Sequence, residues 1–149
     1  KNRPHLDDTI KHITAINDIA FIIGLTAITI GNFLGGVWAN ESWGRYWGWD
    51  AKETWALVSI LVYAFILHMR FIPGLKGVYA FNVSTLFGLA SIVMTYYGVN
   101  YFLSGLHSYA AGEPEQIPQE VFISVAAVVV LSLWALYRYK QVWRSPING

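Results

Sequence analysis

Residues 19–38 read IAFIIGLTAITIGNFLGGVW, twenty consecutive positions without an ionisable side chain. A helix rises 1.5 Å per residue, so a stretch of this length crosses a hydrocarbon core of about 30 Å. Three further stretches have no Asp, Glu, Lys or Arg: residues 54–69, 77–112 and 121–137. The sequence therefore predicts an all-α, multi-pass integral membrane protein with four transmembrane helices, at about residues 16–38, 53–71, 79–103 and 121–140.

The composition of the 149-residue chain agrees with a membrane location. Charged residues make up 13% and hydrophobic residues 55%, whereas soluble domains carry about 25% charged residues. So few charges cannot cover a surface that faces water all round, which excludes a monomeric soluble domain and an intrinsically disordered chain. The net charge of +1 gives no case for nucleic-acid binding, and the chain has no cysteine for a thiolate metal site or covalent haem attachment.

The basic residues predict the orientation in the membrane. With four spans, both termini and the turn at 70–78 lie on one side, which holds eight of the ten Lys and Arg residues. Arg45 and Lys52 are the two on the other side. The positive-inside rule therefore places the termini on the cytoplasmic or stromal side, and the loops 39–52 and 104–120 on the periplasmic or lumenal side.

Small residues form one stripe along the first span. They stand at helical spacings of four, three, four and four: Ala20, Gly24, Ala27, Gly31 and Gly35. Such a stripe lets helices approach closely in lipid, and Gly31 and Gly35 form the familiar GxxxG pattern. We expect the stripe to pack helices, and we infer no cofactor from it.

The loop after the first span is rich in aromatic residues, and residues 43–50 read WGRYWGWD. Two interpretations are open. Trp and Tyr favour the headgroup level, so these side chains could form an aromatic belt. Alternatively, the glycines let the backbone lie flat against a large planar ligand such as haem, and Arg45 and Lys52 could form ion pairs with the carboxylates of that ligand. Asp50 and Glu53 have the spacing of a helix N-cap and its N3 glutamate, so we expect them to start the second helix.

Two histidines stand near opposite ends of the predicted spans. His68 lies fifteen positions after Glu53, about 22 Å along the second helix and near its cytoplasmic end. An ionisable group inside a span is a functional candidate, although a histidine so close to Arg70 could also be interfacial. His107 stands where the third span leaves on the outer side, and a loop histidine commonly has no special role. About 30 Å of bilayer separates the two, so they cannot ligate one metal ion.

Three ordered motifs resemble a known family. The segment 37–57, VWANESWGRYWGWDAKETWAL, resembles the tryptophan-rich "WWD" segment of haem-handling proteins, and more narrowly the CcsA (ResC-like) component of System II cytochrome c biogenesis or the C-terminal part of fused CcsBA synthases. Residues 63–70, YAFILHMR, and 98–109, GVNYFLSGLHSY, are similar to the same family. The resemblance covers about residues 6–109 and implies that the chain 1–149 is a C-terminal portion of such a protein. Ala51 stands where the family usually has Pro, and Gly48 where Ser is common.

The resemblance implies the handling of haem b, its export and its presentation for covalent attachment to apocytochrome c, which brings a Cys-x-x-Cys-His motif. In the family, a transmembrane histidine pair receives haem, and His68 matches one member. An external pair holds haem at the tryptophan loop, and His107 matches its second member. The partner histidines are expected outside this chain, one of them on a CcsB/ResB-type subunit or fused half. The other residues expected at the haem site are Trp43, Trp47, Trp49, Asp50, Tyr46 and Arg45.

Other functions stay open beside this hypothesis. One is a bis-histidine haem subunit of an electron-transfer chain, against which the opposite-side placement of His68 and His107 argues. Others are a CcmC- or CcmF-type haem-handling protein, from which the ETWAL continuation separates this chain, and a structural subunit whose tryptophans form only a belt. We assign no catalytic acid or base. The expected location is the bacterial inner membrane or, in a plastid, the thylakoid membrane.

Overall fold

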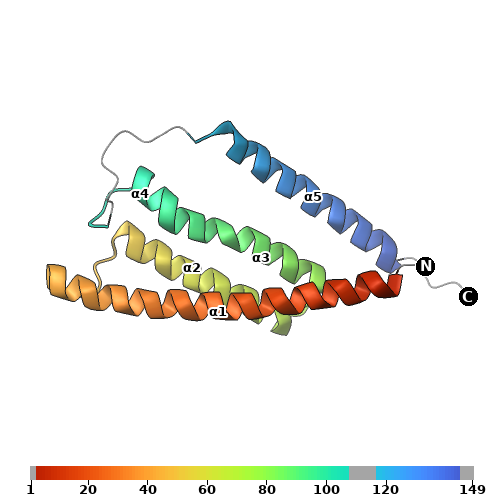
Figure 1. The fold of residues 1–149 in the computed structure, drawn as a ribbon, viewed down its shortest axis with the longest axis horizontal. Helices are drawn as coiled ribbons and strands as arrows, with labels where there is room; N and C mark the ends of the chain where they lie inside the picture. The colour runs from red at the N-terminus through yellow and green to blue at the C-terminus, as the bar shows by residue number, and fades with distance from the viewer. Residues whose placement is uncertain (1–2, 108–116, 145–149) are drawn as a thin grey trace, which may run out of the picture. The chain divides into compact units, whose positions relative to one another are not determined.

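The computed structural model describes residues 3–107 and 117–144, and within these ranges all regular structure is helical. Helix α1 (Arg3–Trp43) is followed by α2 (Ala51–His68), the 3-10 turn η1 (Met69–Phe71), α3 (Val78–Val93), the π-helical turn η2 (Met94–Gly98), α4 (Val99–Phe102) and α5 (Gln119–Arg144). Four segments are long and apolar enough to cross a membrane: His5–Trp43, Ala51–Phe71, Val78–Phe102 and Gln119–Gln141. The all-α, multi-pass prediction is confirmed (Figure 1).

The loop between the first two spans is shorter than the predicted 39–52. Residues 39–43 continue α1, and α2 already begins at Ala51, so the non-helical segment is 44–50. Gly44 ends α1 because its φ of 71° is left-handed and its N–H donates to the Asn40 carbonyl at 2.8 Å. Of the predicted loop 104–120, residues 108–116 lie outside the described residues.

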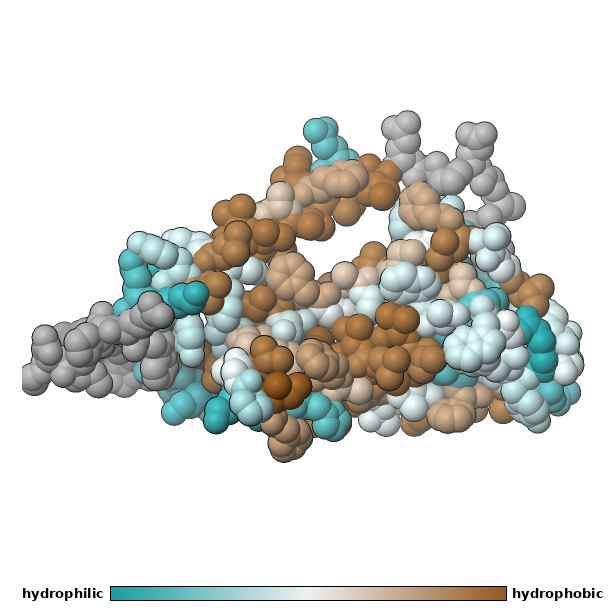
Figure 2. All heavy atoms as spheres, turned by 180° about the vertical axis from the view of Figure 1, so that it is seen from behind, coloured by the Kyte–Doolittle hydropathy of each residue, from teal (hydrophilic) through white to brown (hydrophobic). Residues whose placement is uncertain are grey.

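Helices α1, α2 and α3 pack together around a small core (Figure 1). Phe21 of α1 meets Ile66 and Leu67 of α2 there, and its ring stacks on that of Tyr63 with centroids 4.3 Å apart. Most other large apolar side chains are exposed. Figure 2 shows hydrophobic residues along the middle of the helices and hydrophilic residues toward their ends, the distribution expected of helices that face lipid.

Polar side chains join the helices at the end of the bundle that contains the α2–α3 turn. The Asn17 amide of α1 donates to Asn82 Oδ1 at 3.1 Å and to Thr85 Oγ1 at 2.6 Å, both on α3. Arg70 of η1 forms an ion pair with Asp18 of α1, with Nη2 2.6 Å from Oδ1. Hydrogen bonds of this kind hold helices together in lipid, where apolar burial provides no driving force between them.

The third predicted span is continuous but contains a π-helical turn, Met94–Gly98, between α3 and α4. Thr95 in this turn contacts α2 through its hydroxyl, which lies 2.8 Å from the Ser59 hydroxyl and 2.9 Å from the Trp55 carbonyl. Ser59 is fully buried, so this contact satisfies a polar group between the two helices. The π turn therefore lies at the interface between α2 and the third span. Turns of this kind are frequent at functional sites.

Candidate functional site

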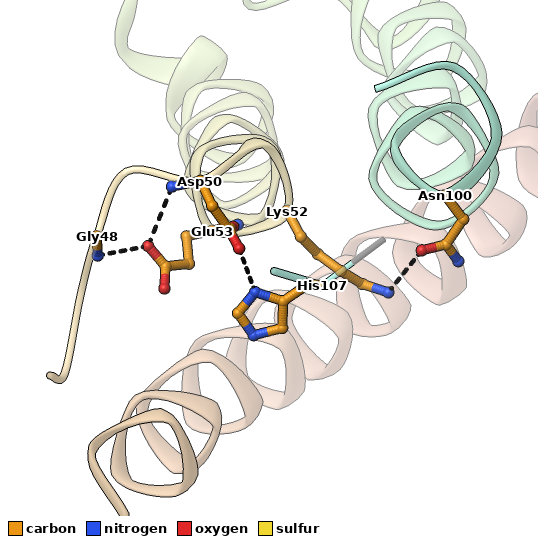
Figure 3. Close-up of polar contacts among 6 residues, drawn as sticks. All are labelled: Gly48, Asp50, Lys52, Glu53, Asn100 and His107. Atoms are coloured by element: carbon orange, nitrogen blue, oxygen red, sulfur yellow. Dashed lines mark hydrogen bonds and ion pairs between the residues drawn. The ribbon is translucent and has the colours of Figure 1, made fainter. Parts of the chain in front are cut away.

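The first turn of α2 is built around two carboxylates. Asp50 Oδ1 accepts from the Glu53 N–H at 2.9 Å, and Glu53 Oε2 accepts from the Asp50 N–H at 3.3 Å, so the expected capping box is present (Figure 3). Glu53 Oε2 also accepts from the Gly48 N–H at 2.7 Å. One buried carboxylate therefore ties the end of the aromatic loop to the start of the second span.

The aromatic loop is held in a strained conformation between these anchors. Trp49 has a φ of 59°, a left-handed value that costs a non-glycine residue about 1–2 kcal/mol. Its neighbours Gly48 and Asp50 both donate to Glu53, which maintains this conformation. A Cβ at Gly48 would lie 0.8 Å from Arg45 Nη1, because the guanidinium occupies the space above this glycine. A serine there, as is common in the resembling family, requires Arg45 to move.

His107, which follows α4, pairs with the second oxygen of the Asp50 carboxylate. Its Nδ1 is hydrogen-bonded to Asp50 Oδ2 (Figure 3), and the side chains of His107 and Asp50 are only 16% and 8% exposed. Burial on its own raises the pKa of the Asp50 carboxyl, but the Glu53 N–H and the hydrogen bond and charge of His107 outweigh it, so this pKa lies below its ordinary value. Asp50 is thus an anion that both caps α2 and binds the histidine ring.

Aromatic rings surround His107 on the α1 side. The Trp43 ring meets the imidazole edge-on with centroids 4.6 Å apart, and Trp38 lies against Trp43 at 5.0 Å and near His107 at 6.2 Å. Trp47 and Trp49 form a second edge-on pair at 5.5 Å. The structure therefore brings Trp43 and Asp50 each into contact with His107, whereas the side chain of Trp49 is mostly exposed.

A cavity of about 300 Å³ adjoins this group and has the size of a small ligand pocket. Its lining includes Gly31, Asn32 and Gly35 of α1, Tyr46 and Trp47 of the loop, Glu53 of α2 and His107. Two buried polar atoms here, Trp47 Nε1 and Glu53 Oε1, have no hydrogen-bond partner among the described residues. A buried donor and acceptor left unpaired indicate that a partner is missing at this site.

The small-residue stripe on α1 explains why the cavity exists. At Gly24 a Cβ would lie 3.5 Å from the Tyr63 ring, which is the close helix packing expected of the stripe. At Gly31 and Gly35 a Cβ would meet nothing within 4 Å. Within residues 3–107, the GxxxG pair therefore does not pack against a helix, contrary to our expectation, but leaves space beside the aromatic loop.

His68 lies at the opposite end of α2, on an exposed face. Its Nδ1 is 2.7 Å from the Ala64 carbonyl, which can only accept, so Nδ1 is the donor in this contact. Its ring is 6.0 Å from that of Phe71. The two histidines are thus separated by the 18-residue length of α2, about 27 Å.

Several residues of the site were not identified from the sequence. The sequence predicts Glu53 only as a capping residue, and it gives no motif for Asn32 and Thr95, although all three line the cavity. A lone amide within a stretch of apolar residues is the signal that would have found Asn32. Lys52, expected to answer a ligand carboxylate, donates to Asn100 Oδ1 at 3.3 Å (Figure 3).

The fold and the site together define a helical multi-pass membrane protein with a histidine and an aromatic-lined cavity at one end of its helices. Residues 3–107 match the model of a family described as cytochrome C assembly protein, and the chain belongs to this family. His107 is the last residue of the match. Together with the CcsA relatives described next, this match confirms the resemblance to the CcsA family drawn from the sequence.

Curated relatives agree with this assignment. Protein NrfI of Wolinella succinogenes is 57% identical over 109 residues, which are 73% of this chain and 12% of that protein. The cytochrome c biogenesis protein CcsA of Cyanophora paradoxa is 50% identical over 86 residues, 58% of this chain and 26% of that protein. CcsA of Oryza sativa is 45% identical over 89 residues, 60% of this chain and 27% of that protein. The chain therefore spans only about an eighth to a quarter of the length of these relatives.

Proposed function

We propose that this chain handles haem in cytochrome c biogenesis, holding it in the cavity beside His107 for covalent attachment to apocytochrome c. The observation that carries this proposal is the part-buried Asp50–His107 pair at an aromatic-lined cavity. In the neutral ring, with Nδ1 donating to Asp50, the lone pair of the imidazole is on Nε2, the atom through which the ring then ligates iron. Membership of the cytochrome c assembly family supports the same function.

The residues around the cavity fit such a ligand. Tyr46 and Trp47 supply aromatic walls, and the Trp47 N–H, which has no partner among the described residues, is a donor for a ligand oxygen. Arg45 and Lys52 are the cations at this end of the helices that suit the propionate groups. When bound, haem supplies an iron that accepts axial ligands and vinyl groups that take up the cysteine thiols of apocytochrome c as thioethers. The protein orients these groups and keeps water from them.

We further propose that the ligand is haem b and that His68 serves a second station. Its exposed position on α2 allows a CcsB/ResB-type subunit or fused half to provide the opposing ligand. The distribution of basic residues supports cytoplasmic or stromal termini, with His107 and the aromatic loop on the periplasmic or lumenal side. The membrane is then the bacterial inner membrane or the thylakoid membrane.

A His107→Gly variant of the full-length protein tests the function. We expect loss of haem from the purified protein and loss of cytochrome c maturation, because the variant lacks an axial ligand, and we expect exogenous imidazole to restore part of both. His12→Gly is the matched control, since His12 is 76% exposed and its Nε2 lies 3.5 Å from Oδ2 of Asp8, one turn earlier on the same helix. Wild-type haem content and maturation in His107→Gly without imidazole would exclude His107 as a ligand.

A further inference from the structure

The Asp50 carboxylate makes two different contacts with its two oxygens. Oδ1 caps α2 by accepting from the Glu53 N–H at 2.9 Å, and Oδ2 accepts from His107 Nδ1. An N-cap needs only the first of these contacts, and Ser, Thr or Asn provides it as well as Asp. Capping alone therefore does not account for a part-buried carboxylate that faces an imidazole.

The chain just before His107 packs against the first residues of α2. The backbone of Gly105 lies so close that a Cβ there would be 3.5 Å from Asp50 Cβ and 3.6 Å from the Ala51 nitrogen. Trp43 closes the other side of the ring at a centroid distance of 4.6 Å. The imidazole is thus confined by the start of a long helix, by its own chain and by an indole.

We infer that Asp50 is a positioning residue for His107. Its carboxylate keeps the proton on Nδ1 and fixes the ring plane, so that the lone pair is on Nε2, the ring nitrogen farther from Asp50 (Figure 3). A carboxylate that accepts from a ligating histidine also raises the basicity of the imidazole toward the metal. This inference rests on the proposed function and adds the group that orients and strengthens its ligand.

Two substitutions separate positioning from capping. Asp50→Asn keeps the shape and the capping oxygen, but its amide donates to Nδ1 and so favours the proton on Nε2, where it blocks ligation. Asp50→Ser keeps a capping oxygen yet is too short to hold the ring. Both variants retain the N-cap, so the start of α2 is preserved.

The experiment compares purified full-length wild type, Asp50→Asn and Asp50→Ser in detergent by haem dissociation constant, low-spin absorption spectrum and midpoint potential. We expect haem affinity to fall about 10- to 100-fold in both variants, the usual effect of removing such a partner, with the spectrum and potential altered and added imidazole restoring them. The melting temperature of the haem-free protein should stay near the wild-type value.

The outcomes distinguish this inference from the proposed function. If His107→Gly loses haem while Asp50→Asn keeps wild-type affinity, spectrum and potential, Asp50 is only a cap and the inference is overturned. If His107→Gly itself retains wild-type haem content, the proposed function is contradicted, whatever the Asp50 variants show. An equal decrease of the melting temperature in Asp50→Asn and Asp50→Ser, with an unchanged low-spin absorption spectrum, would likewise overturn the positioning role.

Discussion

Two glycines in the membrane helices have opposite surroundings, which leads to opposite predictions for the same substitution. Gly31 on α1 lines the cavity, and a Cβ there would meet nothing within 4 Å. Gly88 on α3 faces the core, and a Cβ there would lie 2.8 Å from Ile66 Cδ1 and 3.6 Å from the Phe21 ring. Replacing each by leucine therefore distinguishes an effect on ligand binding, expected at Gly31, from an effect on the packing of the fold, expected at Gly88.

The magnitudes follow from these distances. The Cβ of Gly31→Leu meets nothing within 4 Å, and leucine is favoured over glycine in a helix by up to about 1 kcal/mol, so stability should be unchanged or slightly increased. Its side chain enters a cavity of about 300 Å³ and competes with the ligand for that space, so we expect haem affinity to fall at least about tenfold, which is about 1.4 kcal/mol. Gly88→Leu overpacks a buried contact and should lower the free energy of unfolding by about 1–3 kcal/mol.

The assay measures thermal unfolding and haem affinity of the full-length protein in detergent. Ala27→Leu is the matched control, because Ala27 lies one turn before Gly31 on α1 with an exposed side chain outside the cavity lining. We expect this control to change neither quantity. If Gly31→Leu unfolds as readily as Gly88→Leu, or binds haem like Ala27→Leu, the cavity is not the ligand site and our interpretation of the stripe is wrong.

Three further predictions concern the loop and the helix contacts. Trp49→Gly should raise the free energy of unfolding by about 1 kcal/mol, since glycine adopts the φ of 59° without strain, and calorimetry of the haem-free protein checks this. A double-mutant cycle with Asp18→Ala and Arg70→Ala should give a coupling of about 0.2–1 kcal/mol that weakens in salt, because both side chains are partly exposed; a salt-independent value would contradict the ion pair. Thr95→Val should destabilise the protein by about 1 kcal/mol by removing the partner of buried Ser59, and adding Ser59→Ala should recover part of this loss in the same unfolding assay.

The spans and the start of α2 could be predicted from the sequence because each depends on local chemistry. The length of an apolar stretch alone shows whether it can cross the bilayer. The capping box depends only on two residues three positions apart, Asp50 and Glu53. The end of α1 could not be predicted as closely from the sequence. Residues 39–43 are polar and aromatic but compatible with a helix, and only the left-handed conformation of Gly44 ends it.

The candidate site itself depends on contacts that the sequence pattern does not contain. Asp50 and His107 are 57 positions apart, and they meet only because α2 and α3 pack side by side and the chain after α4 returns to the start of α2. The cavity depends on the absence of a neighbour at Gly31 and Gly35, whereas the GxxxG pattern is typical of a contact. Resemblance to a family singled out His107 but could not supply the carboxylate contact that orients its ring.

Helix α2 links the parts of the proposed function. Glu53 in its first turn binds the N–H groups of Gly48 and Asp50, and Asp50 at its N-cap binds His107, so the aromatic loop and the histidine are both fixed to one rigid element. His68 ends the same helix, about 27 Å away at 1.5 Å per residue. A continuous helix keeps the two histidines at this separation, so they cannot act on one iron at once. If both ligate haem, they do so at two separate stations, and each station requires a second ligand from outside α2.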